Sequence, residues 1–339
     1  MDLDWYLAAN RPTWDRLGHL ADRARRPGGR LQPHEVDELV SLYQRTSAQL
    51  SFARQHFADP SLTAELNTLV ARANAVIYRR TSSPAAGLRR FFAVTFPAAV
   101  WHIRWFVAVA AVALLAPAAV IGPWLGTNDE ALTFAAPEAQ RAAYVNKDFE
   151  NYYSSTPAGE FATEVLVNNI QVSFFAFAAG ALLGLGSVLV LGYNGANLGV
   201  AWALFIDAGQ QPKFWGLILP HGLLELSAVI LAGAAGMTLG WAVVSPGDQS
   251  RAAAFTDAAR RSVMVVLGLM VAFVTAGIIE GFVTPSGLPT AVRVGMGLAV
   301  EAAFVTYIVA FGRRAAAKGL TGLASETLEG DAARAVLAV

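Results

Sequence analysis

The sequence predicts an all-α fold: a polytopic membrane helix bundle of about six spans, with a small soluble N-terminal helical bundle before it. Three observations lead to this prediction. Hydrophobic residues make up 55% of the 339-residue chain and charged residues only 15%, whereas soluble domains carry about a quarter charged residues. The mean hydropathy is +0.44. The long apolar stretches all follow residue 104, and the residues before them are polar and periodic.

Residues 1–83 predict a cytoplasmic domain of three antiparallel helices. Apolar residues recur at helical spacing, as at Trp14, Leu17 and Leu20 in the first helix. The segment Pro27-Gly28-Gly29 ends that helix, Pro33 begins the second, and Asp59-Pro60-Ser61 separates the second from the third.

Residues 84–100 predict an amphipathic helix lying in the membrane interface. Leu88 and several phenylalanines share one side of this helix, and Arg89 and Arg90 lie on the other. The alternative interpretation is that the segment simply begins the first span.

Six segments are expected to cross the membrane and to form a transmembrane bundle over residues 101–312. In order, they are Trp101–Trp124, Ile170–Leu191, Ala196–Gly209, Pro220–Val244, Val263–Val283 and Ala291–Gly312. The third is predicted to be short, because the turn signal Gly192-Tyr193-Asn194-Gly195 interrupts an uncharged stretch. An extracytoplasmic loop at 125–165 and a flexible cytoplasmic tail at 313–339 complete the predicted organisation. The loop is expected either to fold over the outer mouth of the protein or to hold a short amphipathic helix over Pro137–Tyr152.

The distribution of basic residues predicts the orientation. Arginine and lysine cluster before the first span, between the fourth and fifth, and after the sixth, at Arg89, Arg90, Arg104, Arg251, Arg260, Arg261, Arg313, Arg314 and Lys318. Such clusters mark the cytoplasmic side. Six crossings place all three clusters and both termini there and the acidic loop outside, whereas five crossings do not. We therefore predict a multi-pass protein of the cell (plasma) membrane, in contact with lipid.

Several classes of function find no support in the sequence. The chain has no cysteine, which excludes disulfides, thiolate catalysis and cysteine-ligated metals. It has no basic block of the kind that nucleic acid requires, no phosphate-binding loop and no serine nucleophile elbow. The helical signature of zinc hydrolases needs two histidines on one face, and His221 is the only histidine after His102. We therefore predict no enzyme, no cofactor, no metal and no nucleic-acid partner.

A few polar residues inside the apolar region form the candidate site: His221, Glu225, Glu280, Asn169 and Glu301. His221 and Glu225 are four residues apart and so share one helix face. One interpretation is an intramembrane polar site for protons, an ion or a partner. The other is that these groups only join helices by hydrogen bonds, with Glu280 and Glu301 either extended to the membrane interface or paired with Arg293.

Small residues predict close helix packing. The segments Ala178–Gly184 and Ala234–Gly240 share the pattern Ala-Ala-Gly-x-x-x-Gly, as a faint internal repeat or by chance in a chain rich in Ala and Gly. Its glycines, Gly180, Gly184, Gly236 and Gly240, would let helix backbones touch. Such faces also predict a homo-oligomer.

Several motifs resemble a known family. They include Arg11-Pro12-Thr13-Trp14, Tyr193-Asn194-Gly195-Ala196, Pro220-His221-Gly222-Leu223-Leu224-Glu225 and Ile279-Glu280-Gly281-Phe282. In these the chain resembles actinobacterial members of the stage II sporulation protein M family, over residues 1 to about 312. The resemblance implies an integral membrane protein of the cell envelope. In spore formers, the member that gives the family its name is a membrane scaffold. It recruits two peptidoglycan-degrading enzymes, a lytic transglycosylase and an amidase, during engulfment.

Two functions follow as hypotheses. The first is a non-enzymatic membrane scaffold whose outer loop meets envelope or peptidoglycan-remodelling proteins. The second is a channel or transporter that uses His221, Glu225 and Glu280. A water-accessible cavity that reaches Glu225 would favour transport, and a dry core packed on glycines would favour a scaffold.

Overall fold

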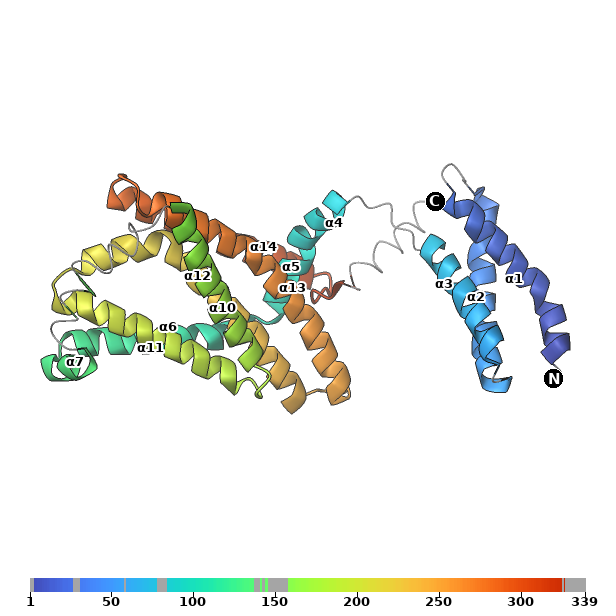
Figure 1. Ribbon diagram of the computed structural model, residues 1–339, viewed down its shortest axis with the longest axis horizontal. Helices are drawn as coiled ribbons and strands as arrows, with labels where there is room; N and C mark the ends of the chain where they lie inside the picture. Colours follow the sequence, from blue (N-terminus) through green and yellow to red (C-terminus); the bar gives the residue numbers. More distant parts are fainter. Residues whose placement is uncertain are drawn as a thin grey trace. The chain divides into compact units, whose positions relative to one another are not determined.

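The computed structural model describes residues 3–26, 31–57, 59–77, 84–136, 141, 144–145, 158–324 and 326. These residues form helices and no β-strand (Figure 1), so the predicted all-α class is confirmed. The chain divides into two compact units, Met1–Pro84 and Ala85–Val339. Each unit has its own core and is described by itself.

The N-terminal unit is a bundle of three helices. They are α1 (Leu3–Arg25), α2 (Pro33–His56) and α3 (Pro60–Ile77), and each contacts the other two. Pro33 lies in the first turn of α2, where a missing N–H costs nothing. Asp59 caps α3, because its Oδ1 accepts hydrogen bonds from the backbone N–H groups of Ser61, at 2.8 Å, and Leu62, at 3.1 Å. Each helix begins or ends close to the break that the sequence predicts.

The segment predicted to lie in the interface is helical but partly buried in the second unit. It consists of α4 (Pro84–Arg90), a π-helical turn η1 (Phe91–Thr95) and α5 (Phe96–His102). Helix α5 contacts α13 and α14, and Phe96 is only 1% exposed. The Tyr307 hydroxyl donates a hydrogen bond to the Phe92 carbonyl at 2.5 Å. The second half of the segment therefore belongs to the bundle, and the interfacial placement of the first half stays a prediction.

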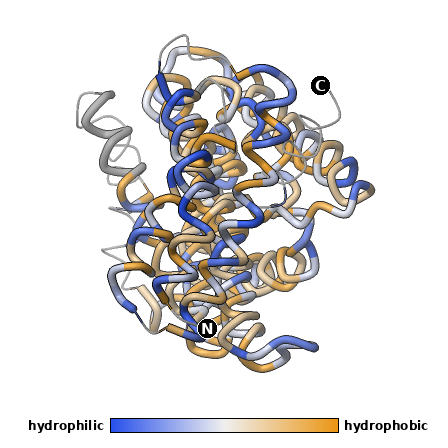
Figure 2. Tube along the Cα trace, turned by 90° about the vertical axis from the view of Figure 1, so that its right-hand side faces the viewer, coloured by the Kyte–Doolittle hydropathy of each residue, from blue (hydrophilic) through white to orange (hydrophobic). Residues whose placement is uncertain are grey.

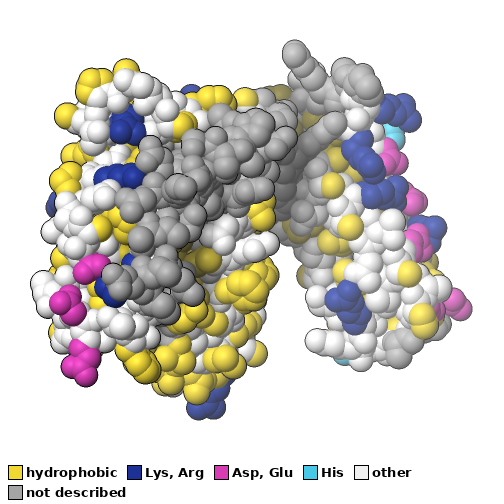
Figure 3. All heavy atoms as spheres, turned by 60° about the vertical axis from the view of Figure 1, so that its left-hand side comes forward, with side chains coloured by type: hydrophobic (Ala, Val, Ile, Leu, Met, Phe, Trp, Pro, Cys, Tyr) yellow, Lys and Arg dark blue, Asp and Glu magenta, His cyan; other side chains and the backbone are white. Residues whose placement is uncertain are grey.

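Five helices of the second unit are long and apolar enough to cross a membrane. They are α6 (Arg104–Gly126), α11 (Leu185–Asp207), α12 (Gln211–Val244), α13 (Arg251–Ile278) with the π-helical turn η3 (Ile279–Val283), and α14 (Thr290–Ala316). Much of the Cα trace is hydrophobic (Figure 2), and large apolar residues of these five helices, such as Val120, Leu189 and Val271, stay exposed. In Figure 3 this hydrophobic surface contrasts with the charged side chains of the N-terminal unit. Lipid is the solvent that suits such a surface.

A sixth helix, α10 (Ala158–Ala179), packs against α11, α12 and α13. It is not among the five candidate spans, and its sequence includes Asn168, Asn169 and Gln171. The predicted count of six crossings therefore depends on whether α10 crosses the membrane, and its crossing stays a prediction.

The boundary predicted between the second and third spans is wrong. The break lies at residues 180–184, where Gly184 takes a left-handed φ of +80° just before α11 begins. The Gly192–Gly195 segment lies inside α11, which is 23 residues long and not short. Gly195 packs so closely on α6 that a side chain there would meet the Leu114 carbonyl. This glycine serves helix packing and not a turn.

Other boundaries also moved. Helix α12 begins at Gln211, with Pro212 in its first turn, so Pro220 lies inside the helix instead of opening it. The predicted short helix Pro137–Tyr152 lies mostly outside the described residues. The predicted tail begins inside α14, and its next residues contact the bundle. Arg261 donates a hydrogen bond to Thr321 Oγ1 at 3.3 Å, and the Thr321 hydroxyl in turn donates to Glu326 at 2.5 Å.

The two glycine-rich segments pack against each other within the chain. A Cβ added at Gly180 would meet the backbone of Gly236, and one added at Gly240 would meet the backbone of Gly184. The turn after α10 therefore lies directly on α12, backbone against backbone. Because these faces are used inside one chain, they do not argue for the predicted homo-oligomer, which stays a prediction.

Candidate functional site

Helix α12 carries the first two side chains of the candidate site. His221 and Glu225 lie one turn apart, so both project from the same face of the helix. His221 is 4% exposed and Glu225 is 7% exposed. Helix α12 contacts α10, α13, η3 and α14. These neighbours surround α12, which explains how two polar side chains on this apolar helix are shielded from lipid.

The third side chain comes from the π-helical turn η3, at the end of α13. Glu280 is only 1% exposed, and its Oε1 lies 3.6 Å from Nε2 of His221. The other ring nitrogen of His221, Nδ1, lies 3.1 Å from the hydroxyl oxygen of Thr284, the residue that follows η3. A π-helical turn adds a residue to a helical turn and so redirects side chains, and such turns recur at functional sites.

The three ionisable side chains form one compact cluster. His221, Glu225 and Glu280 each offer one potential ligand atom, and these atoms lie within 4.8 Å of one another. Asn169 of α10 donates a hydrogen bond to the Glu225 carboxyl group. The structure thus brings together four of the five predicted site residues, drawn from three segments that are far apart in the sequence.

Each carboxylate has one oxygen without a hydrogen-bond partner. Within the described residues, Oε1 of Glu225 and Oε2 of Glu280 are shielded from solvent and accept no hydrogen bond. Buried polar atoms are nearly always paired in folded proteins, and each unpaired atom calls for an explanation. The protein groups alone therefore do not satisfy this cluster.

The fifth predicted site residue, Glu301, lies elsewhere. It is on α14 and accepts a hydrogen bond from the Ser227 hydroxyl of α12 at 2.6 Å. The expected pairing of Glu280 or Glu301 with Arg293 is wrong. The Arg293 guanidinium instead donates to the Thr284 carbonyl and, at 3.1 Å, to the Thr290 hydroxyl.

Thr284 and Ser227 are not among the site residues that the sequence predicts. Thr284 lies four residues after Glu280, a spacing that puts both near one face of a helical segment. That spacing is the signal that could have identified it. Ser227 has no comparable signal, because its partner is on another helix.

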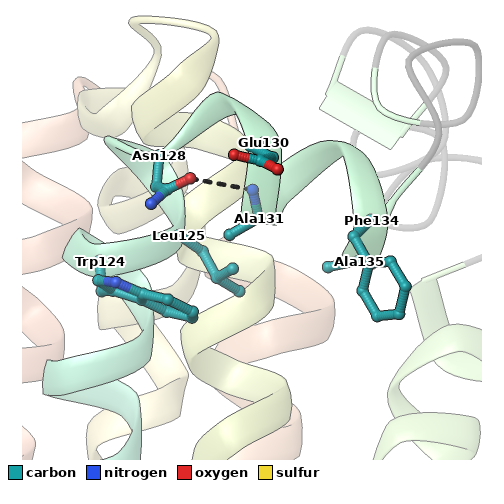
Figure 4. A pocket seen from close by; sticks show the side chains of 7 residues that line it. All are labelled: Trp124, Leu125, Asn128, Glu130, Ala131, Phe134 and Ala135. Carbon is teal, nitrogen blue, oxygen red and sulfur yellow. Dashed lines mark hydrogen bonds between the residues drawn. The ribbon is translucent and has the colours of Figure 1, made fainter.

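The two described surface hollows lie away from the cluster. One lies between the end of α6 and α7 (Asp129–Ala135), and its lining residues are shown in Figure 4: Trp124, Leu125, Asn128, Glu130, Ala131, Phe134 and Ala135. The other is lined by residues of α14: Thr306, Val309, Ala310, Arg313 and Arg314. Neither of these hollows reaches His221, Glu225 or Glu280.

Comparison with known families now identifies the membrane unit. A family model described as stage II sporulation protein M matches residues 105–285, which is more than half of the 339-residue chain. The chain belongs to the stage II sporulation protein M family. The match includes Asn169, His221, Glu225 and Glu280 and leaves out Glu301. The buried cluster thus lies within the part of the chain that defines the family, and the predicted resemblance is confirmed.

Other comparisons give names without activities. Residues 4–79 match a model described as a domain of unknown function, DUF8413. The uncharacterized protein MJ0793 of Methanocaldococcus jannaschii is 33% identical over 100 residues, which are 29% of this chain and 54% of that protein. The chain thus matches about half the length of this relative. No solved structure matches the chain significantly.

Proposed function

We propose that this multi-pass membrane protein is a non-enzymatic scaffold of the cell envelope, which holds peptidoglycan-remodelling proteins at the membrane. The observation that carries the proposal is the close packing of α12 against the segment from α10 to α11. There, Gly180, Gly184, Gly236 and Gly240 bring backbones into contact. A core of this kind is a static frame, because closely packed interiors deform little.

Two regions offer surfaces to partners. The N-terminal unit has a charged surface (Figure 3). Helix α7, at the start of the predicted outer loop, carries acidic Asp129 and Glu130, and its Phe134 is 95% exposed (Figure 4). A large aromatic side chain left in solvent beside charges is a common feature of protein-binding surfaces. We assign envelope partners to this loop and soluble partners to the N-terminal unit.

Transport is the second candidate, and the buried cluster of His221, Glu225 and Glu280 favours it. Ionisable groups within membrane segments are costly and often mark ion or proton pathways. A pathway also needs a route for its ion, and neither described hollow is lined by these residues. The scaffold is therefore the better supported of the two.

Reconstitution of the full chain distinguishes the two candidates. We expect proteoliposomes of the wild type and of Glu225→Gln to show the same low proton and potassium flux as protein-free vesicles. In cells, a photoreactive amino acid at position 134 should crosslink to a peptidoglycan-degrading enzyme. A flux that the wild type supports and Glu225→Gln abolishes would overturn the scaffold in favour of transport, as would the absence of any envelope enzyme among the crosslinked products.

The proposed orientation can be tested cleanly, because the chain contains no cysteine. We expect single cysteines at Ser51 and Lys318, both exposed, to react with an impermeant maleimide only after the membrane is opened. A cysteine at Glu130 should react in intact spheroplasts. If α10 did not cross, five crossings would put Ser51 and Lys318 on opposite sides. Labelling of only one of these two in spheroplasts would therefore refute six crossings.

A further inference from the structure

The cluster formed by His221, Glu225 and Glu280 has the composition of a metal site. It combines one imidazole nitrogen with two carboxylates, and one ligand atom from each lies within 4.8 Å of the others. We propose that this cluster binds one divalent transition-metal ion, Zn²⁺ or Mn²⁺, between α12 and the turn η3. This site goes beyond the scaffold function and does not depend on it.

Among the residues that the structure describes, both carboxylates of the cluster have an oxygen that no hydrogen bond satisfies. Glu280 is 1% and Glu225 is 7% exposed, and within the described part of the chain one oxygen of each accepts no hydrogen bond. The nearby guanidinium of Arg293 is directed to Thr284 and Thr290 instead. Two ionised carboxylates beside a neutral imidazole would carry two negative charges in a lipid-surrounded interior, which is very costly. One divalent cation brings that charge to zero.

The separation of His221 Nε2 and Glu280 Oε1 fits two ligands of one zinc ion. Zinc binds imidazole nitrogen and carboxylate oxygen at about 2.0–2.2 Å, so two such ligands at the tetrahedral angle lie about 3.4 Å apart. The measured separation of His221 Nε2 and Glu280 Oε1 is 3.6 Å, which needs only a small adjustment. Asn169 holds the Glu225 carboxyl group by a hydrogen bond from outside this set of three ligands.

The orientation of the imidazole supports the same conclusion. A metal on Nε2 requires the proton of the neutral ring on Nδ1, and that proton needs an acceptor. The Thr284 hydroxyl oxygen lies 3.1 Å from Nδ1 and can accept it. Metal-binding histidines are usually held in this way through the nitrogen that does not bind the metal.

The donor types choose among cations. Mg²⁺ and Ca²⁺ prefer sites made wholly of oxygen ligands. Soft ions such as Cu⁺ prefer sulfur ligands such as the cysteine thiolate, and this chain has no cysteine. In a mixed set of one nitrogen and two carboxylates, the imidazole suits Zn²⁺, and the carboxylates suit both Zn²⁺ and Mn²⁺. Such an ion would fix α12 to the end of α13 and would stabilise the bundle when bound.

Metal analysis of the full chain tests the proposal. The protein, purified in detergent without a polyhistidine tag and stripped with chelator, should bind one Zn²⁺ or Mn²⁺ per chain when titrated with the metal alone. We expect Glu225→Gln and Glu280→Gln each to weaken this binding more than about 100-fold, because loss of a ligand should exceed the 10–100-fold cost of losing a supporting group. Thr284→Val should weaken it about 10–100-fold.

Glu301→Gln is the matched control, since Glu301 is a glutamate of the same bundle bonded to Ser227 and outside the cluster. It should bind metal as the wild type does. Equal binding by the wild type and the Glu225→Gln and Glu280→Gln variants would overturn the proposal, and so would no binding by the wild type, in which case protons satisfy the carboxylates.

X-ray absorption of the zinc-loaded wild type gives a readout that needs no variant. One imidazole among oxygen ligands is expected. A shell of several imidazoles, from histidines outside the cluster such as His19, His34 and His56, would also overturn the site.

Discussion

The two units of this protein differ in the contacts that hold their cores together. The N-terminal unit buries large side chains: Trp14 is 3% exposed, and Leu17, Leu20 and Leu66 are fully buried. The membrane unit brings its chain segments together where side chains are missing, as where Gly180 meets Gly236. The membrane unit also buries bulky side chains, such as Phe96 and Phe205, but it adds backbone contacts that only glycine permits.

The difference follows from the solvent around each unit. In water, burying a large apolar side chain gains free energy, because it removes apolar surface from water. In lipid that gain is small, since the hydrocarbon tails are as apolar as leucine. Close van der Waals contact and hydrogen bonds then decide how helices associate. Glycine allows such contact, and buried hydroxyls such as Ser187, which donates to the Ala176 carbonyl at 2.6 Å, add the hydrogen bonds.

The largest expected effect comes from filling a glycine contact. A Cβ at Gly236 would lie 2.5 Å from the Phe177 carbonyl oxygen and 2.9 Å from that of Ala176, and backbone atoms cannot rotate away. We expect Gly236→Leu to destabilise the bundle by more than about 4 kcal/mol. Unfolding of the full chain in mixed detergent micelles measures this.

Gly295→Leu is the matched control, because this helical glycine of α14 is exposed and has nothing within 4 Å of an added Cβ. It should change the stability by less than about 1 kcal/mol. Equal losses of stability in the two variants would contradict a special role for the backbone contact at Gly236.

A smaller effect is expected from a cavity in the core of the N-terminal unit. Leu17 is fully buried, so Leu17→Ala should destabilise the N-terminal unit by about 3 kcal/mol. Hydrogen exchange of the full chain should show faster exchange in α1–α3 only. Val36→Ala, at a side chain that is 43% exposed, should change little. Faster exchange that extended to α6–α14 would contradict two units with separate cores.

The sequence predicted some boundaries well because their causes are local. Proline and a capping aspartate favour the start of a helix through local effects alone. Pro33 and Asp59 therefore indicate where α2 and α3 begin, without knowledge of how these helices pack. The break in the membrane unit is different. Gly180–Gly184 and Gly192–Gly195 are both glycine-containing segments that pack closely on another helix, the first on Gly236 and the second on Leu114. Only the first breaks the helix, where Gly184 takes a left-handed φ of +80°. No local pattern contains that information.

The candidate site shows the same limit. The spacing of His221 and Glu225 predicted one shared face, because helical periodicity fixes it. Glu280 joins them only through the packing of α13 on α12 and through the π-helical turn that carries it. The three potential ligands therefore do not form a recognisable spacing in the sequence, since Glu280 comes from a part of the chain distant from His221 and Glu225.

The smallest expected effect concerns charges, which the N-terminal unit keeps at its surface. Glu35 pairs with Arg23 and accepts a hydrogen bond from the Gln32 N–H at 2.7 Å. The Arg23 hydrogen bond, followed by that of Gln32, lowers the pKa of Glu35 from its ordinary 4.5 to about 2. A lowered folded-state pKa stabilises the fold above the unfolded pKa, and this stabilisation is lost as pH falls from about 4.5 towards 2.

We therefore expect Glu35→Gln to flatten the dependence of the N-terminal unit's stability on pH between about 5 and 2. A dye on a cysteine introduced at Ser51, exposed on α2, can follow urea unfolding of this unit in the full chain. Some slope should remain, because hydrogen bonds from Arg16 and Ser61 also lower the pKa values of Glu38 and Asp59. Glu130→Gln, outside this unit, should leave the slope unchanged. An unaltered slope in Glu35→Gln would mean that the ion pair with Arg23 contributes nothing measurable, as is common for exposed pairs.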